Sequence, residues 1–95
     1  MIYVDKLQFG LPKNTRVIAV GRQSGQMWCH LWANDPEELL QFGLKIGLKE
    51  HWLQKKTTLI HFDLVPKLRE KALWNGAVET SLKDWLKKKM KNDRL

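Results

Sequence analysis

Short apolar runs and alternation of apolar with polar residues predict β-strands in the first third of the chain. Residues 2–5 are Ile-Tyr-Val-Asp, residues 17–20 are Val-Ile-Ala-Val, and residues 27–32 are Met-Trp-Cys-His-Leu-Trp. The continuous apolar run at 17–20 is typical of a strand covered on both faces. Because the intervening segment 21–26 contains two glycines and a serine, the pattern predicts a hairpin between the second and third strands.

Helical signals follow directly. Asp35 suits the N-cap, Pro36 the first helical position, and Glu38 lies three residues after the cap. Apolar side chains then recur at helical spacing, and Gly47 suits the position after the last turn, so a helix is predicted over residues 36–46. Similar boundaries predict a second helix from Pro66 to a C-cap at Gly76 and a third helix over residues 81–92.

Two further strands are predicted between these helices. Residues 57–64 are β-branched and apolar, and residues 77–79 form a short second segment. Residues 49–56 are polar and charged around Trp52 and predict a surface loop. Alternation of strands with helices favours a parallel or mixed sheet. The prediction is one α/β domain over residues 1–95, with a mixed sheet of three to five strands and about three helices packed on it.

Charge adds a possible partner class. The net charge is +7, and residues 81–95 hold six basic residues against two acidic ones, a net charge of +4. A basic balance favours polyanionic partners such as nucleic acid, an anionic membrane or an acidic protein. The lysines of the last helix either form a solvated face or contact phosphates without reading sequence. The basic residues in question are Lys83, Lys87, Lys88, Lys91 and Arg94.

The other face of this last helix bears on membrane binding. Its apolar stripe, made of Leu82, Trp85, Leu86 and Met90, is predicted to pack inward and complete the small core. That role argues against an amphipathic membrane helix. With no leader, no apolar run long enough to span a bilayer, and a single cysteine, we expect a cytoplasmic protein without a disulfide.

Candidate chemistry lies in the strand at 27–32. Alternate side chains share a face, so Trp28, His30 and Trp32 are predicted to stand opposite a core face. On that core face Cys29 is predicted to be a small buried hydrophobe. This pattern therefore favours the face with Trp28, His30 and Trp32 as the one that carries the function.

Two carboxylates and a second histidine extend this candidate site. His61 and Asp63 share one face at the carboxyl end of a strand, the edge where open α/β sheets bind ligands, and Asp5 ends the first strand in the same way. Together with His30 they suit a divalent metal or general acid–base chemistry, so the four are candidate catalytic residues. In the alternative structural interpretation, Asp63 caps the helix at Pro66 and both histidines only make local hydrogen bonds.

Several motifs taken in order resemble a small family of bacteria and their phages that is catalogued only as a domain of unknown function. They include Ile2-Tyr-Val-Asp5, Trp28-Cys-His30, His61-Phe-Asp63-Leu and Gly76-Ala-Val, and the resemblance spans roughly residues 1–80. It implies that the Trp-x-His and His-aromatic-Asp segments belong together. Two positions depart from the family: Lys6 replaces a second acid and Val65 replaces a Ser or Thr.

The leading functional prediction is a phage- or prophage-type accessory protein whose basic surface contacts nucleic acid or a host protein that processes it. Exposed Trp52 would stack on a base in that complex. One alternative is a metal-dependent phosphoesterase or nuclease that uses the Asp and His residues above. Another is a protein-only inhibitor or adaptor whose interface is formed by Trp28 and Trp32. No cofactor other than a divalent metal is expected.

Overall fold

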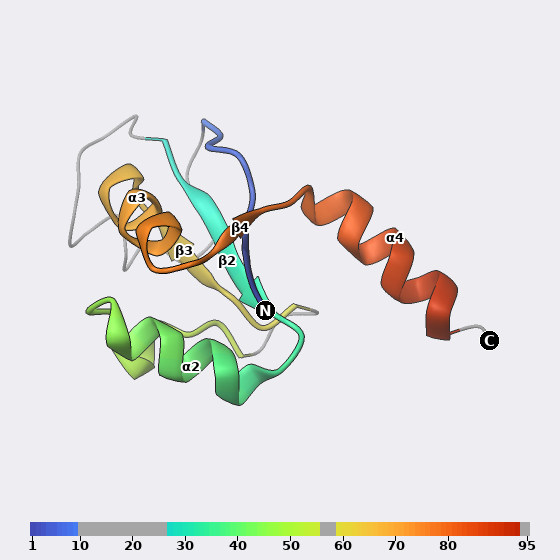
Figure 1. Cartoon of the computed structure of the whole chain (residues 1–95), viewed down its shortest axis with the longest axis horizontal. Coiled ribbons are helices and arrows are strands. Elements are labelled where there is room, and N and C mark those ends of the chain that lie inside the picture. Colours follow the sequence, from blue (N-terminus) through green and yellow to red (C-terminus); the bar gives the residue numbers. More distant parts are fainter. Residues whose placement is uncertain (10–26, 56–58, 94–95) are drawn as a thin grey trace.

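A computed structural model describes residues 1–9, 27–55 and 59–93 and shows a four-stranded sheet (Figure 1). The strands lie in the order β3-β2-β1-β4. Strand β2 is antiparallel to both β1 and β3, and β4 is parallel to β1, so the predicted mixed sheet is confirmed. The strands are β1 (Ile2–Val4), β2 (Cys29–Ala33), β3 (Phe62–Leu64) and β4 (Val78–Glu79).

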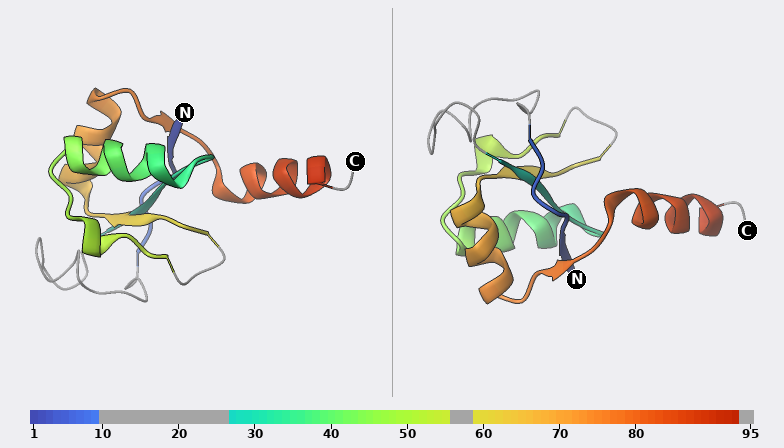
Figure 2. Two further views of the ribbon diagram at one scale, coloured as in Figure 1. Left: turned by 90° about the horizontal axis from the view of Figure 1, so that it is seen from below. Right: turned by 90° about the horizontal axis from the view of Figure 1, so that it is seen from above.

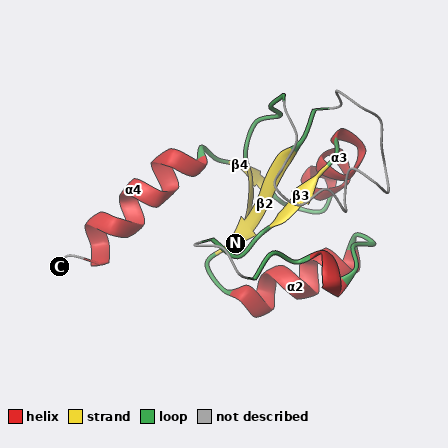
Figure 3. Ribbon diagram, turned by 180° about the vertical axis from the view of Figure 1, so that it is seen from behind, coloured by secondary structure: helices red, strands yellow, loops and turns green. Residues whose placement is uncertain are grey.

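The helices begin and end close to the predicted boundaries (Figure 3). The Asp35 carboxylate accepts the Glu37 N–H at 3.2 Å and caps the first of them. Gly47 and Gly76 follow their helices with φ of 97° and 103°, a left-handed conformation that glycine adopts without strain. The helical segments are α2 (Pro36–Lys45), the short 3-10 helix η1 (Glu50–Trp52), α3 (Pro66–Trp74) and α4 (Leu82–Asp93).

One face of the sheet carries the core. Helices α2 and α3 cover this face, with Leu39, Ile46 and Ala72 buried against the strands. Helix α2 approaches closely at Gly43, where an added Cβ would lie 2.6 Å from the buried Phe62 ring. The strand residues of the core face are Ile2, Val4, Cys29, Leu31, Ala33, Phe62 and Leu64.

The strand at 17–20 and its hairpin lie outside the described residues. The strand predicted over 57–64 is the shorter β3, and His61 just before it forms an isolated bridge with Gln54. The exposed position expected for Trp52 is wrong, because η1 turns this side chain into the core and leaves it only 7% exposed.

Helix α4 stands away from the rest of the domain in all the ribbon views (Figure 2). Because α2 and α3 already cover the core face, and α4 follows the edge strand β4, only its beginning meets the sheet. There Trp85 lies against Tyr3 and Trp32, with ring centroids 6.0 and 5.9 Å away. The predicted inward packing of the whole stripe is wrong, since Met90 is 59% exposed.

In the described segments, none of the helices combines the length and the apolar character needed to cross a bilayer.

Candidate metal centre

The strand directions explain why the four predicted site residues meet. Strands β1 and β3 run the same way, so Asp5 and Asp63 lie toward the same edge of the sheet. Strand β2 runs the opposite way, and its beginning therefore brings His30 to that edge, directly opposite Asp63 in the β2–β3 register. His61 shares a face with Asp63 because it lies two residues earlier. The site thus stands on the face opposite the core.

His30 is oriented by Asp5. The Asp5 carboxylate accepts the His30 backbone N–H through Oδ1 and lies 2.7 Å from His30 Nδ1 through Oδ2. Because an ionised carboxylate only accepts, Nδ1 carries a proton, and in the neutral imidazole the lone pair is then on Nε2. The edge of the Trp28 ring packs on the imidazole, 4.8 Å between centroids. His30 is therefore held with Nε2 available as a ligand.

His61 is oriented in the same sense by a backbone group. Its Nδ1 lies 2.7 Å from the Leu59 carbonyl oxygen, which only accepts, so Nδ1 is again the donor. Its Nε2 points to Asp63 Oδ1 at 3.2 Å. Two histidines whose Nδ1 atoms are engaged by a carboxylate and a carbonyl are arranged as metal-binding imidazoles usually are.

Asp63 is a buried carboxylate with an unsatisfied oxygen. Only 3% of the residue is exposed, and among the described residues Oδ1 receives no hydrogen bond unless Nε2 of His61, 3.2 Å away, carries a proton. The alternative prediction that Asp63 caps α3 is wrong, because Val65 is the N-cap and no side chain caps that helix. A buried charged oxygen without a donor is costly unless a proton or a cation neutralises it.

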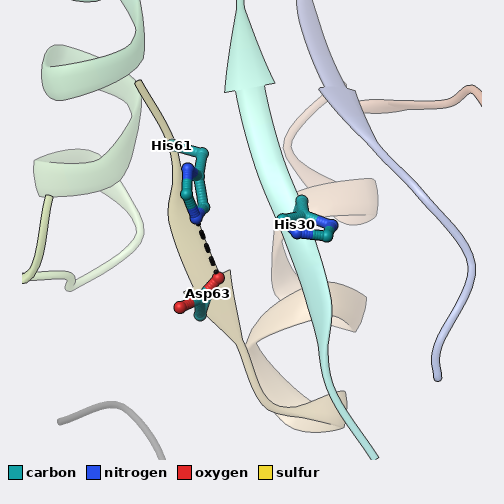
Figure 4. Close-up of side chains that lie close together, drawn as sticks. All are labelled: His30, His61 and Asp63. Carbon is teal, nitrogen blue, oxygen red and sulfur yellow. Dashed lines mark ion pairs between the residues drawn. The ribbon is translucent and has the colours of Figure 1, made fainter. Parts of the chain in front are cut away.

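The side chains of His30, His61 and Asp63 lie close together (Figure 4). One ligand atom each from His30, His61 and Asp63 lies within 4.8 Å of the others. In the figure Asp63 lies on β3, His61 lies just before that strand and is joined to Asp63 by the dashed line, and His30 lies on the adjacent strand β2. Ligands at about 2.1 Å from one tetrahedral ion are about 3.4 Å apart, so closing around an ion needs side-chain movements of about 1 Å.

The donor set selects the kind of metal. Two imidazoles and one carboxylate suit Zn²⁺, Fe²⁺ or Mn²⁺, whereas Mg²⁺ and Ca²⁺ prefer oxygen ligands alone. Three protein ligands leave further coordination positions for water or substrate, as in catalytic rather than structural zinc sites.

Without a metal, the protonation of His61 decides the charge beside Asp63. Burial alone lowers the pKa of this histidine, but the hydrogen bonds with Asp63 and with the Leu59 carbonyl, and the charges of Asp63 and Asp5, raise it above its ordinary value overall. A proton on Nε2 then takes the place that a cation would occupy beside Asp63.

Arg69 completes the support of Asp5 and was not among the predicted site residues. Its Nε donates to the Asp5 backbone oxygen at 3.0 Å, and its Nη2 donates to Glu79 Oε1 at 2.5 Å. One arginine on α3 thereby ties the end of β1 to β4. An arginine three residues into a helix carries no distinctive sequence signal for this role, because its partners are 64 and 10 residues away.

The remaining residues of the strand at 27–32 divide clearly. Cys29 is fully buried, and burial, with the Asp5 charge, raises the pKa of its thiol to about 12, so the prediction of a buried hydrophobe is confirmed. Trp32 is fully buried under Tyr3 and Trp85, so the two tryptophans do not form a continuous exposed surface. His30 is the residue of this face that reaches the centre.

The predicted basic surface lies on α4, apart from the centre. Lys83, Lys87 and Lys88 are exposed on this helix, which also carries Lys89 over the Trp85 ring at 5.1 Å. Arg94 and the side chain of Lys91 lie outside the described part of the structure.

A family model matches residues 2–92, almost the whole chain. The chain belongs to the DUF4031 family, described as a protein of unknown function. This confirms the resemblance to a domain of unknown function, while the motif pattern, a bacterial or phage origin and a cytoplasmic location stay predictions. No curated protein and no solved structure matches the chain.

Proposed function

We propose that this protein is a metal-dependent phosphoesterase that acts on nucleic acid, with His30, His61 and Asp63 as metal ligands. The observation that carries the proposal is that one ligand atom from each of two histidines with engaged Nδ1 atoms and one from a buried carboxylate lie within 4.8 Å of one another. Three such ligands would hold one transition-metal ion and leave positions for water and a phosphate oxygen.

Each residue has a definite part in this proposal. A bound ion of this kind lowers the pKa of a bound water and polarises a phosphoryl oxygen. Asp63 would supply a negatively charged ligand for the ion. The imidazoles of His30 and His61 would supply its nitrogen ligands. Asp5 is a positioning residue, since both of its oxygens are engaged by His30.

The substrate class is supported by charge. The chain carries a net charge of +7, and a row of exposed lysines lies on α4. A polyanionic substrate is attracted by such a surface, and lysine contacts to phosphates do not depend on base sequence.

The test is cleavage of labelled single- and double-stranded DNA and RNA with Mn²⁺ or Zn²⁺, and with EDTA. We expect metal-dependent cleavage that His61→Gln and Asp63→Asn abolish. The matched control His51→Gln changes an exposed histidine of η1 and should keep full activity. Cleavage that survives EDTA, or that Asp63→Asn leaves intact, would contradict the proposal.

A second candidate function is nucleic-acid binding without hydrolysis, which the exposed lysines of α4 favour. Binding measured across a salt series should then weaken steeply, and Lys87→Ala should reduce the slope of log K against log salt by about 1. Affinity that does not respond to salt would exclude this electrostatic interface.

A further inference from the structure

A hollow of about 510 Å³ opens beside the candidate metal centre. It lies between the residues after β1 and the link from β4 to α4, and we call it the Asp5 hollow. Asp5 belongs to both sites, since it lines the hollow and its carboxylate holds His30. The polar lining residues are Asp5, Lys6, Gln8, Glu79, Thr80, Ser81 and Lys83.

The charges of the Asp5 hollow do not cancel. Its two acids are already engaged: Glu79 pairs with Arg69 at 2.5 Å, and both Asp5 oxygens are engaged by His30. Lys6 and Lys83 are exposed and have no ion-pair partner among the described residues. With Glu79 paired to Arg69, two ammonium groups stand against the single carboxylate of Asp5, so the lining keeps a net positive charge.

A hydroxyl group adds a hydrogen-bond donor. Ser81 Oγ accepts the Asp84 N–H at 3.2 Å, which leaves the hydroxyl proton of Ser81 free to donate toward the hollow. Two lysines and a hydroxyl are suitable ligands for a phosphate group. Lys83 is also the first of the exposed lysines on α4, so the hollow continues into that basic row.

From these observations we infer that the Asp5 hollow binds a backbone phosphate of a polynucleotide next to the phosphate that the metal centre attacks. This inference rests on the proposed function and specifies how its substrate is held. Lys6 and Lys83 would grip the neighbouring phosphate, and the strand would continue along α4. The metal centre alone would then bind small phosphate esters weakly.

Phosphate binding to the metal-free protein tests the hollow independently of catalysis. Inorganic phosphate titrated into chelator-treated protein should give saturable NMR shifts of the Lys6 and Ser81 amides. Lys6→Ala and Lys83→Ala should each weaken this binding about tenfold, the effect of losing one charge-assisted hydrogen bond. The matched control Lys67→Ala removes an exposed lysine of α3 outside the hollow and should change nothing. No saturable shift, or equal weakening by Lys67→Ala, would overturn the inference.

Substrate length tests the polynucleotide part. Short oligonucleotides should bind the metal-free protein more tightly than inorganic phosphate or a mononucleotide, and Lys83→Ala should raise KM for them while kcat is retained. Equal affinity for all three ligands would overturn the polynucleotide assignment.

The Asp63→Asn variant separates the two proposals. If it still binds phosphate but no longer cleaves, both proposals are supported. If the protein cleaves but does not bind phosphate in the metal-free state, only the assignment of the hollow is overturned.

Discussion

Asp5 is the residue through which the protein controls His30. Both of its oxygens meet the same histidine, one at the backbone N–H and one at Nδ1, each at 2.7 Å. Such a partner fixes the ring and raises its basicity as a ligand. Asp5 therefore orients a metal ligand and is not itself one, although its position at the end of a strand had suggested a direct metal ligand.

Replacing Asp5 by Asn should weaken metal binding without destroying it. An amide is a poorer acceptor for Nδ1–H, and loss of this kind of partner costs about 10–100-fold in metal affinity. Isothermal titration with Zn²⁺ measures the change. Asp35→Asn is the matched control, because Asn caps α2 as well as Asp and lies outside the centre. Unchanged affinity in Asp5→Asn would remove its positioning role.

His61 gives the metal-free protein a specific pH dependence. Its pKa in the folded state lies above its ordinary value of about 6.5, so the folded state binds this proton more tightly than the unfolded state. The resulting stability is fully present below about pH 6.5 and is lost as the pH rises through the folded pKa.

Denaturant unfolding of metal-free protein from pH 5 to 9 measures this contribution. We expect the free energy of unfolding to contain a component that falls across the neutral range and that His61→Gln removes. The control His51→Gln should retain it. If the free energy of unfolding of His61→Gln changed with pH in parallel with that of the wild type, the His61–Asp63 pair would contribute nothing to the pH dependence of stability.

At the scale of elements, helix α2 is seated on the sheet through Gly43. An added Cβ would meet the Phe62 ring at 2.6 and 2.8 Å, and the buried ring has little room to move. Overpacking of this kind costs about 1–3 kcal/mol, against a helix-propensity gain of about 1 kcal/mol for alanine.

Gly43→Ala should therefore lower the free energy of unfolding by about 1 kcal/mol, the middle of a net range of about 0–2 kcal/mol, measured by urea denaturation. Gln41→Ala, on the exposed side of the same helix, should stay within about 0.5 kcal/mol of wild type. A stabilised Gly43→Ala protein would mean that α2 can shift away from Phe62.

Helix α4 is joined to the sheet through one aromatic cluster. Trp85 contacts Tyr3 and Trp32, and the helix beyond it leaves the body of the domain. Trp85→Ala should destabilise the protein by about 1–3 kcal/mol through loss of two aromatic pairs. Met90→Ala should have almost no effect, because this side chain is 59% exposed. Thermal unfolding separates these outcomes, and equal effects of the two variants would contradict the single anchor.

The predictability of these elements follows from how local their signals are. The ends of α2 and α3 were predictable because proline, the Asp35 cap and two glycines act within a few residues. The position of α4 was not predictable, because its apolar stripe has the right spacing and only the completed core shows that little room is left for it. Trp52 was misplaced for a related reason, since a single 3-10 turn within a polar segment turns it inward.

At the scale of the whole molecule, the candidate centre depends on sheet topology. The strand-edge pattern suggested that His30, His61 and Asp63 meet, but their meeting requires β2 to run between β1 and β3 and antiparallel to both. Periodicity in one sequence does not determine strand order. The role of Arg69 depends on the same long-range arrangement and was not predicted. The hydrogen bond of His61 to the Leu59 carbonyl, two residues away, is the local bond that the structural interpretation expected.

The domain as a whole then has two parts with different chemistry. A half-buried centre of two histidines and a carboxylate lies on the face of the sheet opposite the core, and a lysine-bearing helix extends from the sheet edge. The Asp5 hollow is linked to both, because Asp5 lines it and holds His30, and Lys83 of α4 lines it as well. This arrangement is the physical basis for proposing a metal-dependent enzyme with a polyanionic substrate.

The most direct test of the account is an anomalous difference map from crystals grown with Zn²⁺ or Mn²⁺. We expect one strong peak bonded to His30 Nε2, His61 Nε2 and an Asp63 oxygen, with Asp5 hydrogen-bonded to Nδ1 of His30. A map without a peak at this position, or with metal held only by surface residues, would contradict the metal centre and the function built on it.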